Sequence, residues 1–114
     1  GLDVAVHWAP GREVSGDTYW TARPPGGGLV AAVADVVGKG LPAALLMATV
    51  QAGLRMLTPG LTPATLAAAT AQLDRLVAES TEPHQFVTMA WAIVDGPAVT
   101  YVVAGHPAPR VVRA

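Results

Sequence analysis

A valine-rich apolar run at residues 29–37, interrupted by the single charge of Asp35, is the feature that most constrains how this chain folds. A short run of β-branched side chains predicts a strand that is buried on both faces. A turn that contains Gly38 and Gly40 follows at once, and helix-forming residues begin at Leu41. A buried strand that leads through a tight turn into a helix indicates a fold in which a sheet packs against helices.

Further β-prone segments supply neighbours for this strand. The turn residues 24–28 precede it and predict a hairpin with the strand before them. Asp95, Gly96 and Pro97 separate two later apolar segments and predict a second hairpin. The predicted strands lie at residues 2–8, 18–22, 29–37, 86–94 and 99–104, and another is expected to begin at Val111.

Helix-forming residues fill the middle of the chain. The first helix is apolar nearly all round, so we expect other parts of the protein to cover it on more than one side. Thr62 is predicted to cap a second helix, with Pro63 at its first position. Strands on either side of two helices between Leu41 and Glu79 predict an α+β fold, with an antiparallel sheet and the helices packed on one face.

Composition narrows the class of protein. The chain has 114 residues, of which 52% are hydrophobic and 13% charged, which argues against intrinsic disorder. Its net charge of -1 gives no electrostatic basis for binding nucleic acid or an anionic membrane. The absence of cysteine excludes disulfides and thiolate metal sites and fits the cytoplasm. Polar residues break the apolar stretch at residues 41–57, so a membrane span is not expected there.

Two acidic residues occupy unusual places. Asp17 lies where a predicted strand begins, and Asp35 lies near the end of the valine-rich strand. A carboxylate in a buried strand is costly unless it is paired or bound to a cation, and two carboxylates at neighbouring strand ends would suit Mg²⁺ or Mn²⁺. Structural roles remain open at this point. Asp17 could accept hydrogen bonds in a turn, and Asp35 could cap the first helix or pair with Lys39.

Other common motifs are not supported. The segment 38–40 lacks the serine or threonine and the glycine spacing of a phosphate-binding loop. The three histidines, His7, His84 and His106, have no short-range ligand spacing, and His106 is interpreted as a loop residue that bonds its neighbours. No serine stands in a nucleophile-elbow pattern, so serine hydrolase chemistry is not expected.

Four segments, in one order, resemble the SpoIIE/RsbU type of metal-dependent PPM serine/threonine phosphatase. Residues 10–19 are similar to that family's opening motif, and residues 35–44 are similar to its aspartate-valine-serine-glycine-lysine-glycine signature and the helix that follows. Residues 86–88 and 104–107 are similar to two later landmarks. The resemblance covers nearly the whole chain.

This resemblance implies an αββα sandwich with a binuclear Mn²⁺ or Mg²⁺ site at one edge of the central β-sandwich. By motif, Asp17 and Asp35 would be metal ligands, together with the backbone carbonyl of Val36. A metal-activated water would attack a phosphoserine or phosphothreonine, so no catalytic side chain is expected. The family's substrate is typically a phosphorylated anti-sigma-factor antagonist in a partner-switching pathway.

Three departures from the family pattern change what is expected of this chain. Val37 replaces a serine in the signature, and Trp20 stands where many members have an aspartate that could contact the metal or its water. The third departure is that the family domain continues with further acidic ligands. Residues 1–114 are therefore expected to be one domain truncated on its C-terminal side, with weak metal binding and little or no turnover.

The expected truncation predicts association with other chains or domain parts, and it leaves an alternative function open. Open sheet edges and apolar faces predict a homodimer or association with the missing parts of the domain. The alternative to an enzyme is a non-catalytic regulatory or protein-binding module that keeps the phosphatase fold.

Overall fold

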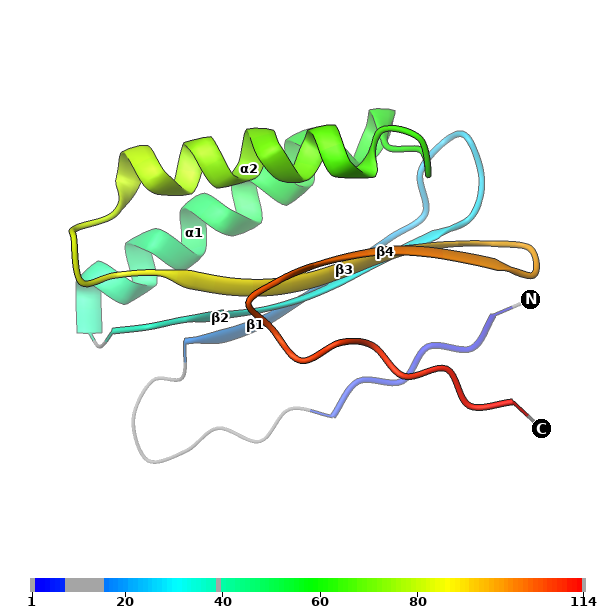
Figure 1. Cartoon of the computed structure of the whole chain (residues 1–114), viewed down its shortest axis with the longest axis horizontal. Coiled ribbons are helices and arrows are strands. Elements are labelled where there is room, and N and C mark those ends of the chain that lie inside the picture. The colour runs from blue at the N-terminus through cyan, green and yellow to red at the C-terminus, as the bar shows by residue number, and fades with distance from the viewer. Residues whose placement is uncertain (1, 8–15, 39, 114) are drawn as a thin grey trace.

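The computed structural model describes residues 2–7, 16–38 and 40–113 and contains one sheet and one helical layer (Figure 1). Four antiparallel strands lie in the order β1-β2-β3-β4. Both helices cover the same face of this sheet. The elements are β1 (Asp17–Ala22), β2 (Leu29–Val36), α1 (Gly40–Leu57), the short 3-10 helix η1 (Thr58–Gly60), α2 (Leu66–Ser80), β3 (Val87–Asp95) and β4 (Ala98–Ala104).

The predicted α+β class is therefore confirmed, and so are both hairpins. β1 pairs with β2, and β3 pairs with β4, each antiparallel. The two hairpins join side by side through β2 and β3, with Val36 opposite Val87 at one end and Leu29 opposite Val94 at the other. A helical layer on one sheet is half of an αββα sandwich, so the arrangement is consistent with an incomplete PPM fold.

The hydrophobic core lies between the sheet and the helices. Trp91 of β3 is 1% exposed there, against Leu54 of α1 and Leu66 of α2, which are 0% and 1% exposed. Its indole Nε1 donates to Thr70 Oγ1 at 2.8 Å, and that hydroxyl donates to the carbonyl of Leu66 at 2.7 Å. The polar atom of the largest core side chain is thus satisfied inside the apolar layer.

Among the described residues, no helix covers the opposite face of the sheet, and here the prediction that the valine-rich strand is buried on both faces was wrong. Successive side chains of β2 point to opposite faces, so Val33, which is 46% exposed, lies on the side away from the helices. Only segments without regular secondary structure, residues 2–7 and 106–113, run below this face within the described chain (Figure 1).

Two predicted strands do not form in these segments. Residues 2–7 and the segment around Val111 have no strand structure, and Trp8 lies outside the described residues. An alternating pattern becomes a strand only where a neighbouring strand supplies backbone hydrogen bonds. The ladders that the structure describes end at β1 and β4.

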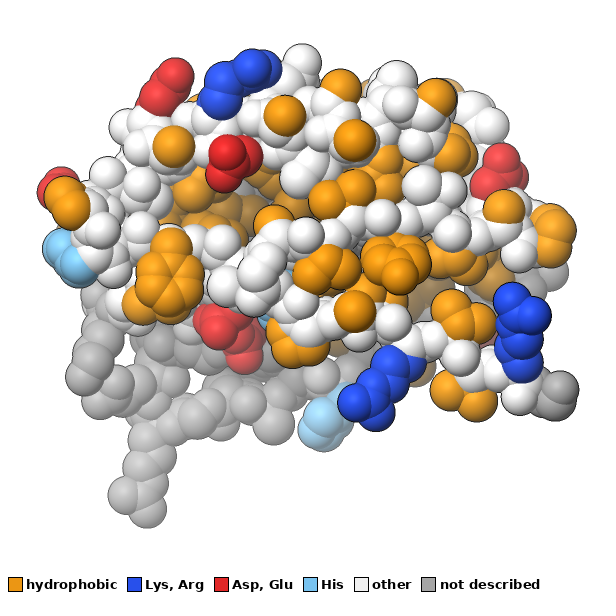
Figure 2. Space-filling view, in the orientation of Figure 1, with side chains coloured by type: hydrophobic (Ala, Val, Ile, Leu, Met, Phe, Trp, Pro, Cys, Tyr) orange, Lys and Arg blue, Asp and Glu red, His pale blue; other side chains and the backbone are white. Residues whose placement is uncertain are grey.

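The first helix is covered on fewer sides than its sequence predicts. Leu46, Val50 and Leu54 are buried, whereas Leu41 is 71% exposed and Leu45 is 60% exposed. In the described chain, α2 and the sheet contact only the buried side of α1. On the side seen in Figure 2, where α2 and β4 face the viewer, hydrophobic side chains also reach the surface across the middle, and charged side chains lie mainly around the edge.

The second helix begins three residues later than predicted. The Thr65 hydroxyl contacts both the backbone N–H of Thr62 (2.9 Å) and its carbonyl (3.2 Å), which closes a turn over residues 62–65. The backbone N–H of Ala69 then donates to the carbonyl of Thr65 at 2.9 Å, and α2 begins at Leu66. Thr62 therefore starts a turn before the helix, and it does not cap the helix itself.

Candidate functional site

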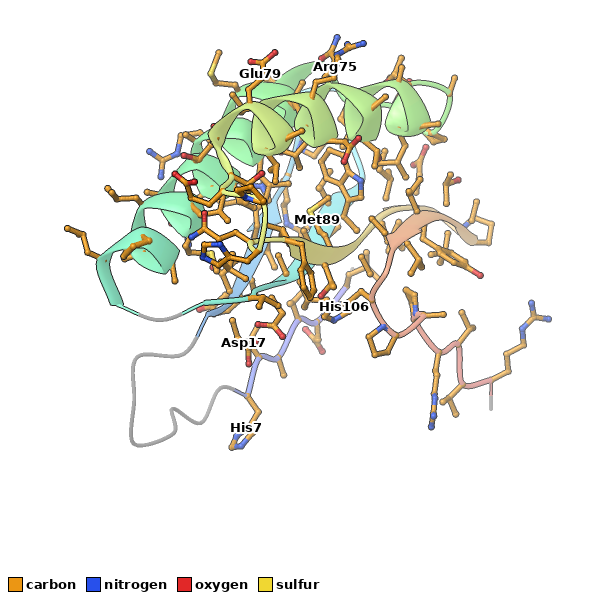
Figure 3. The ribbon with its side chains drawn as sticks, turned by 60° about the vertical axis from the view of Figure 1, so that its left-hand side comes forward. His7, Asp17, Arg75, Glu79, Met89 and His106 are labelled. Carbon is orange, nitrogen blue, oxygen red and sulfur yellow. The ribbon has the colours of Figure 1, made fainter. Side chains whose placement is uncertain are left out.

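The structure brings Asp17 and Asp35 together at one end of the sheet. They lie directly opposite each other in the β1–β2 ladder. Both occupy the strand positions that point away from the helices, as Figure 3 shows for the labelled Asp17. Side chains directly opposite in an antiparallel pair are about 4.5–5.5 Å apart at Cβ, so two carboxyl groups share one small region of the surface.

This proximity changes the acidity of the pair. Partial burial raises the pKa of Asp35 from its ordinary value, and a hydrogen bond with Asp17 and the negative charge of Asp17 raise it further. The electrostatic interaction with His106 acts in the opposite direction and lowers the pKa of Asp35. A carboxyl that resists ionisation beside another carboxyl is a place where a bound cation would relieve repulsion.

The Val36 carbonyl lies beside these acids because residue 16 is glycine. The backbone N–H of Val36 donates to the carbonyl of Gly16 at 3.0 Å. A Cβ at position 16 would lie 2.2 Å from the Val36 carbonyl oxygen, a distance that side chains do not tolerate. Close approach of two backbone segments thus requires glycine directly before Asp17. This positioning role was missed in the sequence, although its signal, a glycine next to a candidate ligand, is present there.

Thr88 and His106 complete this end of the sheet. Thr88 of β3 lies opposite Asp35 in the β2–β3 ladder, and its Oγ1 is 2.9 Å from Nδ1 of His106. Gly105 bridges to Met89 and has a φ of +67°, a conformation that glycine adopts without strain. The chain therefore turns after β4 and places His106 over the end of β3. The two later motifs of the sequence meet at the paired acids.

A cavity of about 280 Å³ opens at this point, on the face of the sheet away from the helices. Both aspartates and His106 line it, together with His7 from the N-terminal segment. A larger apolar cavity of about 480 Å³ continues along the same face, between the sheet and the two terminal segments. The acids thus lie at the polar end of an otherwise apolar surface.

Trp20 is not part of this site. Its side chain packs with the helix-side core, its Nε1 donates to Thr58 Oγ1 at 3.1 Å, and the Arg55 guanidinium lies 5.8 Å from its ring centroid. Strand alternation explains this, because Asp17 and Trp20 are an odd number of residues apart and so point to opposite faces. The departure from the family pattern at position 20 therefore affects the packing of β1 against α1.

Other residues considered in the sequence lie elsewhere. His84 is exposed in the loop before β3, and Lys39 and residues 10–15 of the opening motif lie outside the described residues. Within the described chain, no group of three or more histidine, cysteine or acidic side chains is arranged to hold a metal. The oxygen donors that the structure brings together are two carboxylates and the neighbouring Val36 carbonyl.

Comparison with known proteins identifies the family to which this architecture belongs. Residues 25–114 match the family described as Stage II sporulation protein E (SpoIIE). The match covers well over half of the chain, so the chain belongs to the SpoIIE family, and its similarity to the RsbU type of PPM phosphatase domain is confirmed. PPM-type phosphatases generally use Mn²⁺ or Mg²⁺.

Two relatives place the chain more closely. It is 32% identical over 108 residues to the "Phosphoserine phosphatase RsbU" of Bacillus subtilis (strain 168), a match that covers 92% of this chain. It also resembles the crystal structure of the RsbU and RsbW domains of Rv1364c from Mycobacterium tuberculosis, with a TM-score of 0.68 and 30% identity over 82% of this chain. The chain spans 31% of the first relative and 26% of the second.

Proposed function

We propose that this chain carries the metal-binding part of a PPM-type protein serine/threonine phosphatase domain. The observation that supports this most directly is the pairing of Asp17 with Asp35 on the open face of the sheet, in a chain of the SpoIIE family. The substrate class would be a phosphoserine or phosphothreonine protein, such as a phosphorylated anti-sigma-factor antagonist. A cytoplasmic location follows from such a substrate.

The donor set fits a hard divalent cation. Carboxylate and carbonyl oxygens are the ligands that Mg²⁺ and Mn²⁺ prefer. Partial burial, and then the neighbouring Asp17, raise the pKa of Asp35, and a bound cation would offset both effects because it favours the charged form. Asp17, Asp35 and the Val36 carbonyl would hold Mn²⁺ or Mg²⁺. When bound, the metal would lower the pKa of a coordinated water and neutralise charge on the phosphoryl group.

The chain's own residues would supply position and charge. Strands β1 and β2 hold the two carboxylates in register, and Gly16 admits the Val36 carbonyl beside them. The chain contains no cysteine, and no side-chain nucleophile is required because water is the attacking group. Catalysis would therefore depend on how rigidly the sheet end holds its oxygen donors.

Activity of these 114 residues by themselves is expected to be weak. Mg²⁺ demands six oxygen ligands, usually several of them waters, and two carboxylates with one carbonyl are few protein donors for a binuclear site. We therefore expect weak Mn²⁺ binding and little turnover. The open apolar face also supports association with another copy of the chain or with further parts of the domain.

Calorimetric titration of the chain with Mn²⁺ tests this proposal. Asp35→Ala should weaken binding by about tenfold or more, because losing a direct ligand costs at least as much as losing an outer partner. Asp95→Ala is the matched control, since Asp95 is an exposed acid at the opposite end of the sheet.

Equal Mn²⁺ affinity in Asp35→Ala and the unmodified chain would contradict the metal site. Phosphatase turnover gives a second measurement. Robust hydrolysis of p-nitrophenyl phosphate by the chain, abolished in Asp35→Ala, would support the site and overturn the expectation of weak activity. No metal binding at all would favour the non-catalytic binding module.

A further inference from the structure

The Thr88–His106 pair is the part of the site that metal binding leaves unexplained. Both side chains are partly buried, and they belong to separate motifs eighteen residues apart that meet beside Asp35. Of the other side chains that line the same cavity and can donate hydrogen bonds, His7 and Tyr19 are exposed, and the Thr18 hydroxyl accepts from Gln51 of α1 at 2.7 Å. Figure 3 shows His106 on the same side of the sheet as Asp17, opposite the helix residues Arg75 and Glu79.

The contact with Thr88 restricts which nitrogen of His106 is available. Nδ1 is engaged at 2.9 Å by the Thr88 hydroxyl, so Nε2 is the ring atom left to reach a ligand. When the hydroxyl donates to Nδ1, the neutral imidazole carries its proton on Nε2. The ring is then a hydrogen-bond donor without any change of charge.

The charges around the cavity indicate what this donor would serve. Asp17 and Asp35 line it from β1 and β2, Tyr19 lines it from β1, and His7 lines it from the N-terminal segment. A phosphate group placed next to two carboxylates needs a cation on one side and hydrogen-bond donors on the other. His106 is a partly buried donor, and Thr88, the residue opposite Asp35 in the β2–β3 ladder, holds it in place.

We propose that His106, oriented by Thr88, binds a phosphoryl oxygen of the substrate through Nε2–H at the edge of the paired-aspartate site. The inference rests on the proposed phosphatase function. It makes His106 a substrate-binding residue and Thr88 a positioning residue. Gly105 contributes to the same arrangement, because its φ of +67° turns the chain so that the imidazole lies over Thr88.

Titration of the chain with O-phospho-L-serine in excess Mg²⁺, followed by NMR of the histidine ring signals, tests this role. The His106 signals should shift on binding, and His106→Ala should weaken phosphoserine affinity by about tenfold, the effect of one hydrogen bond to a charged group. His106→Gln should restore most of the affinity, because its amide donates near the same position but does not titrate.

Matched variants of Thr88 distinguish the role of its hydroxyl in orienting His106 from the role of its side-chain volume. Thr88→Val should weaken binding severalfold, whereas Thr88→Ser, which keeps the hydroxyl, should not. His84→Ala should leave affinity unchanged, because His84 is exposed in the loop before β3 and does not line the cavity. A purely structural role for His106 would lower the urea midpoint of His106→Ala and leave its phosphoserine affinity intact.

The outcomes also separate this inference from the metal site. Unchanged phosphoserine affinity in His106→Ala overturns the inference, and so does absence of phosphoserine binding in excess Mg²⁺. If Mn²⁺ affinity is normal in His106→Ala and lost in Asp35→Ala, the metal site stands whatever the phosphoserine result. If Asp35→Ala keeps its Mn²⁺ affinity, the proposed function fails first.

Discussion

The two faces of the sheet differ in how completely the described chain covers them. The helix face is closed by α1 and α2, and the indole nitrogens of both Trp20 and Trp91 donate to threonine hydroxyls. The open face carries Asp17 and Asp35 at one end and an apolar cavity along the rest. The contacts that stabilise the fold lie mainly on the closed face, whereas the groups that could bind a metal or a substrate lie on the open face.

This division has a physical reason. A carboxylate pair that binds a cation and a phosphate must remain accessible to both. The repulsion between the two carboxylates destabilises the fold, so contacts elsewhere in the structure must offset it. The closed face supplies these contacts, because its side chains fix β1 and β2 in register. A change on the closed face should therefore alter stability far more than a change of the same size on the open face.

The largest expected effect comes from truncating the closed face. Leu54→Ala should lower the free energy of unfolding by about 2–5 kcal/mol, because Leu54 is fully buried between the helices and the sheet. Val33→Ala, on the open face, should change it by only about 0.5 kcal/mol. Urea denaturation of both variants measures the difference. Similar losses in the two variants would mean that association or a covering segment buries the open face in solution.

A smaller loss of stability is expected from a substitution at the close backbone contact between β1 and the end of β2. Gly16→Ala places a methyl group against the Val36 carbonyl oxygen, and neither backbone segment can move without disturbing the β1–β2 ladder. The expected loss is about 1–3 kcal/mol in the free energy of unfolding. Mn²⁺ affinity should fall as well, which calorimetric titration checks. Gly26→Ala is the control, since a Cβ there meets nothing within 4 Å.

Much of the closed face could be predicted from the sequence. Hairpins and helices depend on local periodicity and on turn residues such as Asp95 and Gly96, so their order and the α+β class were correct. The sequence could not predict which side of α1 is buried, because a helix that is apolar nearly all round has no polar face to mark its exposed side. The predicted start of α2 was wrong because the Thr65 side chain hydrogen-bonds to the backbone of Thr62 and closes a separate turn before the helix.

The site was accessible to sequence reasoning only in part. Asp17 and Asp35 were singled out because charge in or next to an apolar strand is rare. The pairing of Thr88 with His106 depends on the β2–β3 register and on the turn at Gly105, both of which are fixed by tertiary structure. The orientation of Trp20 was within reach, since counting from Asp17 along one strand gives the opposite face.

The smallest effect tests the cost of ionising Asp35, which is partly buried and lies beside Asp17. Because the pKa of Asp35 is raised in the folded chain, folding is favoured while Asp35 is protonated, and this contribution is lost as pH rises through the raised pKa. In EDTA at neutral pH, Asp35→Asn should therefore increase the free energy of unfolding by on the order of 0.5–1 kcal/mol, the size of a cross-strand charge effect. Urea denaturation at acidic and neutral pH should show the gain only above the pKa. Added Mn²⁺ should reverse the order of stability, because the folded unmodified chain binds the metal more tightly than the variant and is stabilised more by it. A loss of stability in EDTA at neutral pH would instead give the Asp35 carboxylate a structural role, such as a cap for α1.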